Sequence, residues 1–146
     1  MTASGVSDDE GGEAPCWLHE LDAMAEAGRL HTDAPAAVVV DLGARSTAGA
    51  SGVVWALEAS AELNANVVKL DPGHAIGEHV NGEVDVFVYV LSGDGSVTID
   101  GRTSPLAADH AVLVPRGARR SVRAGATTLL YLSVHRRRGP LQVAAR

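Results

Sequence analysis

The chain has 146 residues and a formal net charge of −6, so it has the length of one domain and can bury a sizeable core. The negative charge, with only two Trp, two Tyr and one Phe, argues against a nucleic-acid partner, which needs basic and aromatic surface. No apolar run approaches the ~20 residues that span a bilayer, so we expect no membrane partner.

Acidic and basic residues are divided unevenly along the chain. Residues 1–101 carry 17 acids against 3 bases, whereas residues 102–146 carry 9 arginines against the single acid Asp109. We interpret this division as acidic and basic strands that become neighbours in the fold or across a dimer. The alternative is a basic patch that binds an anionic small molecule.

The N-terminal region divides into a tail and a helical segment. Residues 1–14 are rich in Gly, Ser and acids, which predicts a disordered acidic tail. The tail lacks the basic region of a secretory signal and Cys16 is alone, so we expect a cytoplasmic protein. Residues 15–35 are predicted to be helical because apolar residues recur on one stripe after Pro15. The stripe comprises Trp17, Leu18, Leu21, Met24 and Ala25.

Residues 36–146 are predicted to form one all-β domain. Short β-branched runs separated by Gly and Pro turns are typical of a sandwich or barrel. The apolar run 86–91 predicts a strand buried on both faces, and Asp100-Gly101 predicts a tight hairpin after 96–99. The expected strands are 36–42, 53–58, 66–71, 86–91, 96–99, 111–114, 121–123 and 127–135, with an edge strand around Leu141 and Val143.

The stretch from Gly73 to Gly95 holds most of the candidate functional groups. Polar and ionisable side chains gather on what reads as a loop just before the strand 86–91, namely His74, Glu78, His79, Asn81, Glu83 and Asp85. Ligating side chains placed before a buried strand suit a site at the mouth of a closed β-structure.

These residues resemble the first motif of the cupin family, which reads Gly, five residues, His-x-His, a short gap, Glu, six residues, Gly. Gly73, His79 and Gly93 match this motif. Asn81 stands where the family has its second histidine. Val86 stands where the glutamate belongs, and Asp85 is one residue away.

The second cupin motif reads Gly-Asp, a strand, Pro-x-Gly, two residues and His. It is matched here by Asp109, the strand 111–114 and Pro115-Arg116-Gly117. Arg120 stands at the position of the metal-binding histidine. The resemblance covers residues 53–135 and implies a small jelly-roll barrel that commonly pairs as a homodimer.

By this resemblance, a cupin metal would be held by three imidazoles and a carboxylate, of which only His79 remains. A guanidinium stays protonated and places a positive charge beside any cation. We therefore expect no metal cofactor. A rebuilt site for a divalent transition metal would use His74, His79 and Asp85, all taken to lie on one loop.

Three functional hypotheses remain open. In the first, a metal-free cupin with a sensor or accessory role binds a small anionic molecule through His79, Asn81, Asp85 and Arg120. The second is a metal-dependent dioxygenase or isomerase with a rebuilt ligand set, and the third is a structural dimerising module. An arginine aimed into a barrel needs an anionic partner. That partner is Asp85 or Glu83 in the structural hypothesis, and a bound carboxylate or phosphate in the first.

Each candidate residue also has a plain structural interpretation. His74 on a glycine-rich loop suits a surface position. Asn81 with the following glycine is itself a turn dipeptide. Asp85 suits an ion pair with a nearby arginine.

Overall fold

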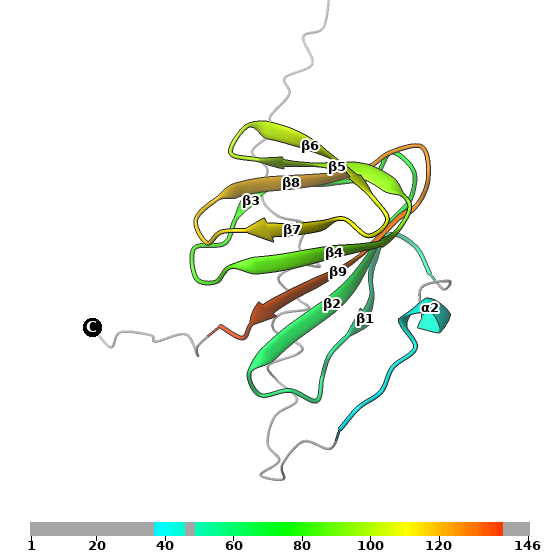
Figure 1. Cartoon of the computed structure of the whole chain (residues 1–146), viewed down its shortest axis with the longest axis vertical. Coiled ribbons are helices and arrows are strands. Elements are labelled where there is room, and N and C mark those ends of the chain that lie inside the picture. The colour runs from blue at the N-terminus through cyan, green and yellow to red at the C-terminus, as the bar shows by residue number, and fades with distance from the viewer. Residues whose placement is uncertain (1–36, 46–48, 139–146) are drawn as a thin grey trace, which may run out of the picture.

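The computed structural model describes residues 37–45 and 49–138, which form two antiparallel sheets packed face to face (Figure 1). The five-stranded sheet has the order β1-β2-β9-β4-β7, and the four-stranded sheet has the order β3-β8-β5-β6. The all-β class and the jelly-roll architecture predicted from the sequence are confirmed. The elements are α2 (Leu42–Arg45), β1 (Gly52–Ala56), β2 (Leu63–Leu70), β3 (Ala75–Val80), β4 (Val86–Ser92), β5 (Asp94–Ile99), β6 (Arg102–Ala107), β7 (Ala111–Val114), β8 (Arg119–Ala124) and β9 (Leu129–Arg136).

Several predicted segments lie outside the described residues. These are the acidic tail (1–14), the helical segment (15–35) and the edge strand around Leu141 and Val143. Within the described ranges, no helix is long and apolar enough to cross a membrane.

Two predictions of where the strands lie are wrong. Residues 37–41 form no strand and are followed by the single turn α2, with Val39 99% exposed. β-Branched residues favour a strand only when neighbouring strands cover them, and no strand of the described residues pairs with 37–41. Conversely, residues 75–80, taken as a loop, form β3, in which only Ile76 is buried. The remaining predictions, 53–58, 66–71, 86–91, 96–99, 111–114, 121–123 and 127–135, correspond to β1, β2, β4, β5, β7, β8 and β9.

The strand β4 is buried on one face only, contrary to the prediction for 86–91. Val86 and Val90 point into the barrel and are almost fully buried. Phe87 on the opposite face is 45% exposed, beside its cross-strand partner Leu113 on β7, which is 62% exposed. An antiparallel sheet can leave one face open to solvent. Because the solvent-facing residues of β4 are also apolar, its sequence does not show the alternation of apolar and polar residues that is typical of such a strand.

The hairpin between β5 and β6 forms at Asp100 and Gly101 as predicted. Both residues have positive φ angles, 47° and 80°, as a type I′ turn requires. The Asp100 side chain also accepts a hydrogen bond from the backbone N–H of Arg119 (2.9 Å), which ties the hairpin to β8.

The turn between β4 and β5 is fastened to the loop before β9. The Asp94 carboxylate accepts hydrogen bonds from the Thr127 hydroxyl, the Thr127 backbone N–H (2.9 Å) and the Ala126 N–H (3.3 Å). Because these bonds favour the charged form, they hold the pKa of Asp94 below its usual value. Gly93, with φ of 86°, is the residue that separates β4 from β5.

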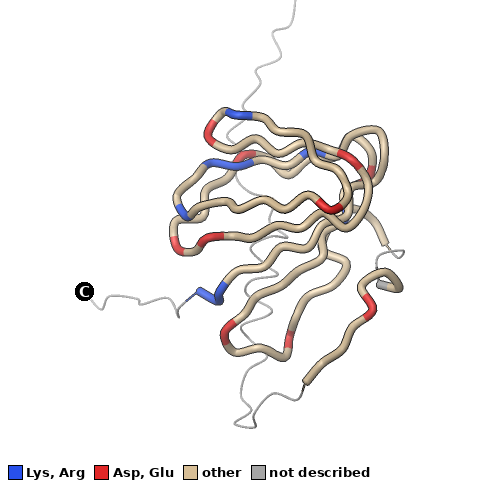
Figure 2. Tube along the Cα trace, in the orientation of Figure 1, with Lys and Arg blue, Asp and Glu red and all other residues tan. Residues whose placement is uncertain are grey.

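Acids from the first part of the chain pair with arginines from the last part. Glu78 on β3 binds Arg119 on β8 (2.9 Å), and Glu83 lies 3.4 Å from Arg138. Figure 2 shows the acidic turns beside the arginine-bearing strand ends. The interpretation that acidic and basic strands become neighbours is confirmed within the fold. Because the pair of Glu78 and Arg119 is largely open to solvent, it contributes about 0–1 kcal/mol.

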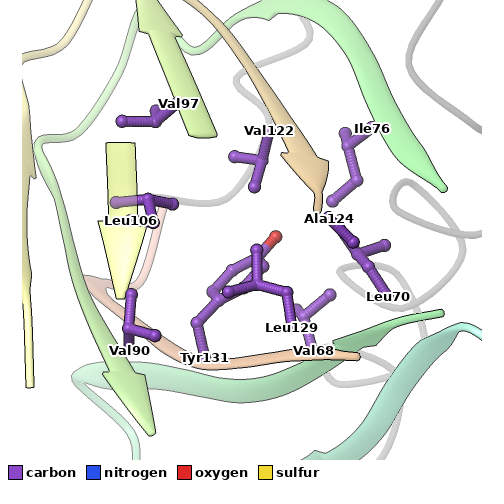
Figure 3. Close-up of a cluster of buried hydrophobic side chains, with 10 residues drawn as sticks. All are labelled: Val68, Leu70, Ile76, Val90, Val97, Leu106, Val122, Ala124, Leu129 and Tyr131. Atoms are coloured by element: carbon purple, nitrogen blue, oxygen red, sulfur yellow. The ribbon is translucent and has the colours of Figure 1, made fainter. Parts of the chain in front are cut away.

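The core fills the space between the two sheets (Figure 3). The large sheet contributes Val68, Leu70, Val90, Leu129 and Tyr131, and the small sheet contributes Ile76, Val97, Leu106, Val122 and Ala124. A second cluster, Val84, Val86, Val114 and Ala118, continues it. The candidate site lies between these clusters.

Candidate functional site

A cavity of about 40 Å³ lies between the two sheets, and most of its wall is aliphatic. Strand side chains alternate between faces, so every second residue of these strands points inward. On the large sheet, β4 and β7 supply Val86, Val88, Val112 and Val114. On the small sheet, β5, β6 and β8 supply Val97, Leu106 and Val122.

Three polar side chains complete the wall of the cavity. They are Arg120 from β8, and Tyr131 and Ser133 from β9. On β8 the neighbours Arg119 and Arg123 are exposed, which places Arg120 on the inward face with Val122. One cation and two hydroxyl groups therefore line a space that is otherwise hydrocarbon.

Tyr131 lies deep in the barrel and is 5% exposed. In Figure 3 its hydroxyl points away from β9 toward Val122 on the opposite sheet. Burial raises the pKa of the Tyr131 phenol, and the positive charge of Arg120 opposes that shift. The phenol is thus a neutral hydrogen-bond donor at physiological pH, within the electrostatic reach of a guanidinium.

The structure brings two of the four predicted binding residues together. His79 on β3 is the cross-strand partner of Arg120 on β8. The His79 side chain is half-buried, and its Nδ1 lies 2.9 Å from the carbonyl oxygen of Gly77.

Asn81 and Asp85 hold turns rather than line the cavity. The Asn81 side-chain oxygen accepts the backbone N–H groups of Glu83 (3.0 Å) and Val84 (3.3 Å), although its amide nitrogen is buried with no hydrogen-bond partner in the described structure. The exposed Asp85 accepts the backbone N–H of Arg116 (2.8 Å). Asp85 therefore contacts the main chain of this arginine rather than its guanidinium.

The residues of the alternative metal set do not gather. The Nδ1 of His74 lies 2.7 Å from the hydroxyl oxygen of Ser51, and the Ser51 hydroxyl donates its hydrogen bond to Asp71 (3.0 Å). Asp85 is engaged at the Arg116 turn, apart from His74. Across residues 37–45 and 49–138, no three His, Cys, Asp or Glu side chains lie together as metal ligands would. With a guanidinium on the cavity wall as well, the donor set does not fit a divalent cation.

The strands β9 and β2 carry inward-facing polar residues that were not among the predicted site residues. Tyr131 and Ser133 line the cavity, and Ser133 pairs with Asn66 on β2. The Asn66 amide donates to the Asn64 side chain (2.8 Å), and Asn64 is buried. The signal was the two-residue spacing of Leu129, Tyr131 and Ser133, which places a phenol and a hydroxyl on the same face as a core leucine.

The chain is similar to several known proteins. The model of the family described as "Cupin domain" matches residues 66–135. A curated relative, "Polyketide synthase CurC" from Streptomyces cyaneus, is 40% identical over 52 residues, which are 36% of this chain and only 34% of the relative. The chain therefore matches about a third of that protein's length.

Two solved structures share the fold. The TT1209 protein from Thermus thermophilus is 27% identical with a TM-score of 0.60, over 69% of this chain and 98% of that one. BH2720 from Bacillus halodurans is 22% identical with a TM-score of 0.63, over 72% and 84% of the two chains. The family match over residues 66–135, together with the two-sheet barrel that these residues help to form, shows that this part of the chain is a cupin domain.

Proposed function

We propose that this cupin domain binds a small anionic molecule inside its barrel without a metal, in a sensor or accessory role. The observation that carries the proposal is Arg120 on the wall of an otherwise aliphatic cavity. A guanidinium stays charged at every physiological pH and presents its N–H donors as a fork that matches a carboxylate or phosphate. Charge-assisted hydrogen bonds are stronger in such a water-poor interior than at the surface.

The two acids that the structural hypothesis names as internal partners of Arg120 are engaged elsewhere. Glu83 pairs with Arg138 (3.4 Å), and Asp85 accepts the backbone N–H of Arg116 (2.8 Å). Both carboxylates are exposed, and neither lines the cavity. The two carboxylates are therefore held at surface turns and not on the cavity wall.

The similarity to a polyketide synthase extends the choice of candidate ligands. A polyketide chain is built from β-keto units, and its free acids are carboxylates. We therefore propose β-keto acids such as acetoacetate as members of the ligand panel, alongside simple carboxylates and phosphate.

Thermal unfolding of the purified chain with and without each anion tests the proposal. A ligand present at 100 times its Kd stabilises the folded state by about 2.7 kcal/mol, which raises the Tm by roughly 5–10 °C for a domain of this size. We expect at least one organic anion to produce such a shift. If none does at concentrations up to tens of millimolar, the structural hypothesis gains support and the binding proposal fails.

We also expect the purified chain to carry no stoichiometric transition metal. The reason is the donor set, in which Arg120 and Val86 occupy wall positions where the family resemblance would place ligands. Elemental analysis after purification without chelator or affinity metal measures this directly. Near one equivalent of Fe, Mn, Ni, Cu or Zn that disappears in His79→Ala would favour the enzyme hypothesis instead.

A further inference from the structure

We propose that the outer face of the five-stranded sheet binds the segment 15–35 of this same chain, through the apolar stripe of that segment. The surface concerned, which we name the outer apolar face, comprises Trp55, Ala65, Val67, Phe87, Leu113, Leu130, Leu132 and Val134. It lies on the side of the sheet away from the cavity, so this contact does not depend on the proposed function.

Strand alternation turns these side chains away from the core. On β9, Leu129 and Tyr131 belong to the core between the sheets, so Leu130, Leu132 and Val134 face outward. Cross-strand pairs join the outward residues into two apolar rows. The first row crosses β2, β9, β4 and β7 as Ala65, Val134, Phe87 and Leu113. The second row crosses β1, β2 and β9 as Trp55, Val67 and Leu132. Monomeric soluble proteins rarely leave a contiguous apolar surface of this kind open to water.

The exposure of the outer apolar face falls from the β7 edge toward β2. Leu113 on β7 is 62% exposed and Phe87 on β4 is 45% exposed, whereas Leu130 on β9 is 7% exposed and Val67 on β2 is fully buried. Neither Leu130 nor Val67 belongs to the two clusters between the sheets. Side chains stand roughly perpendicular to a sheet, so an open face exposes their ends. We therefore infer that the half of the face on β2 and β9 is covered and that the half on β4 and β7 is open.

The chain itself approaches this covered half from the β1 edge. Residues 37–41 lead into α2, and α2 contacts β1 (Figure 1). The segment 15–35 ends one residue before this stretch, so it joins the described part of the chain on the β1 side of the sheet. Five strands at a spacing of about 4.8 Å make a face about 24 Å wide. A helix of about 21 residues extends about 31 Å, which is long enough to cross that face.

The predicted helix also has the chemistry of a cover. Its stripe of Trp17, Leu18, Leu21, Met24 and Ala25 needs an apolar surface to pack against, and Glu20, Asp22 and Glu26 fall on its other sides. The same stripe on a second copy of the chain would fit the face equally well. The tether decides between them, because a segment joined by a short linker has an effective concentration of about millimolar at its own face.

Trypsin reports on this contact because Arg29 lies inside the segment. Cleavage requires the segment to leave the face, so its rate tracks the population of the open form. Leu21→Asp places a charge on the stripe, and Leu132→Asp places one on the covered half of the face. We expect each substitution in the full chain to speed cleavage after Arg29 by about tenfold or more, because a buried unpaired charge is strongly unfavourable.

Each of these variants has a matched control. Ala23→Asp places the same charge about 200° around the predicted helix from Leu21, and Leu113→Asp places it on the open half of the face. Both controls should change the cleavage rate by less than about twofold. Leu21→Asp combined with Leu132→Asp should be cleaved no faster than the faster single variant, since both remove the same contact. Equal rates in Leu21→Asp and Ala23→Asp would overturn the proposal, and this comparison stands even if Leu132→Asp folds poorly, because residues 21 and 23 lie outside β1 to β9.

The dependence of the cleavage rate on protein concentration identifies the occupant. A contact within one chain gives a rate that is constant over a roughly hundredfold range of concentration. A rate that falls as the concentration rises, with a sedimentation mass that halves in Leu21→Asp, would show that a second copy occupies the face and would overturn the intramolecular contact. Binding of anions in the cavity enters neither result, so failure of this proposal and failure of the proposed function are separate outcomes.

Discussion

Gly93→Ala is expected to lower the Tm of this domain by roughly 10 °C or more. The substitution removes no contact and only adds a methyl group. A Cβ at Gly93 would lie 1.9 Å from the carbonyl oxygen of Thr128 and 2.7 Å from its carbonyl carbon. These are backbone atoms that lead directly into Leu129, which is fully buried, so they cannot move aside cheaply. Overpacking of this kind costs about 1–3 kcal/mol. The left-handed backbone at φ of 86° adds about 1–2 kcal/mol for any residue with a Cβ.

Gly101→Ala is the matched control for this prediction. Gly101 has nearly the same backbone angle, with φ of 80°, but a Cβ there would meet nothing within 4 Å. Its expected cost is therefore the backbone term alone, about 1–2 kcal/mol. Chemical denaturation of both variants measures the difference, which isolates the clash with Thr128. Equal losses in the two variants would contradict the steric explanation.

The glycine also shows what the sequence could reveal about the fold. Gly93 was recognisable as a motif residue and as a turn signal. Its close approach to Thr128 was not, because that contact joins β4 to the loop before β9, 35 residues later in the chain. Local signals of this kind correctly predicted the Asp100-Gly101 hairpin and the β-branched strands other than 36–42. Such local signals do not predict contacts between strands that are distant in the sequence.

The strand β3 was missed for a related reason. Its residues Gly77, Glu78 and His79 carry no β-branched or aromatic side chain, and only Ile76 enters the core. The strand forms because β8 pairs with it from Ala75 to Val80. Pairing supplied by a distant strand overrides a weak local preference.

For the site, the inward direction of Arg120 could be predicted from its spacing after Pro115-Arg116-Gly117, whereas the position of Asp85 was misjudged. Side chains on a strand alternate with a period of two, so a shift of one residue moves a side chain to the other face. Val86 points inward at 2% exposure, and Asp85 is therefore excluded from the interior. The two-residue spacing places Tyr131 and Ser133 on one face of β9. Because the β9 sequence is apolar on both faces, the spacing does not say which face is interior, and the pairing with β4 and β2 does.

Arg120→Met is expected to abolish the gain in Tm that the best-binding carboxylate gives to the unmodified chain. Methionine fills much of the same space along the wall but has neither charge nor donor. Loss of a charge-assisted, forked contact costs about 1.5–3 kcal/mol, which corresponds to a roughly 10- to 150-fold weaker affinity. Titration calorimetry with that carboxylate measures the change directly. Arg120→Lys keeps the charge but loses the fork, so its affinity should lie between those of the other two proteins.

Arg119→Met is the matched control, because Arg119 is the preceding residue on β8 and points outward. Its guanidinium binds Glu78 at 2.9 Å on the surface, and its loss should change affinity for the carboxylate by less than about twofold while lowering stability by about 0–1 kcal/mol. The structural hypothesis predicts another result for Arg120→Met: a lower Tm in the absence of any ligand, with no anion able to shift either protein. Equal affinity for that carboxylate in Arg120→Met and in the unmodified chain would show that the anion binds elsewhere. The combination of retained folding, lost carboxylate binding and an unaffected Arg119→Met would instead identify Arg120 as the anion receptor, because only the inward-facing arginine of the neighbouring pair lines the cavity.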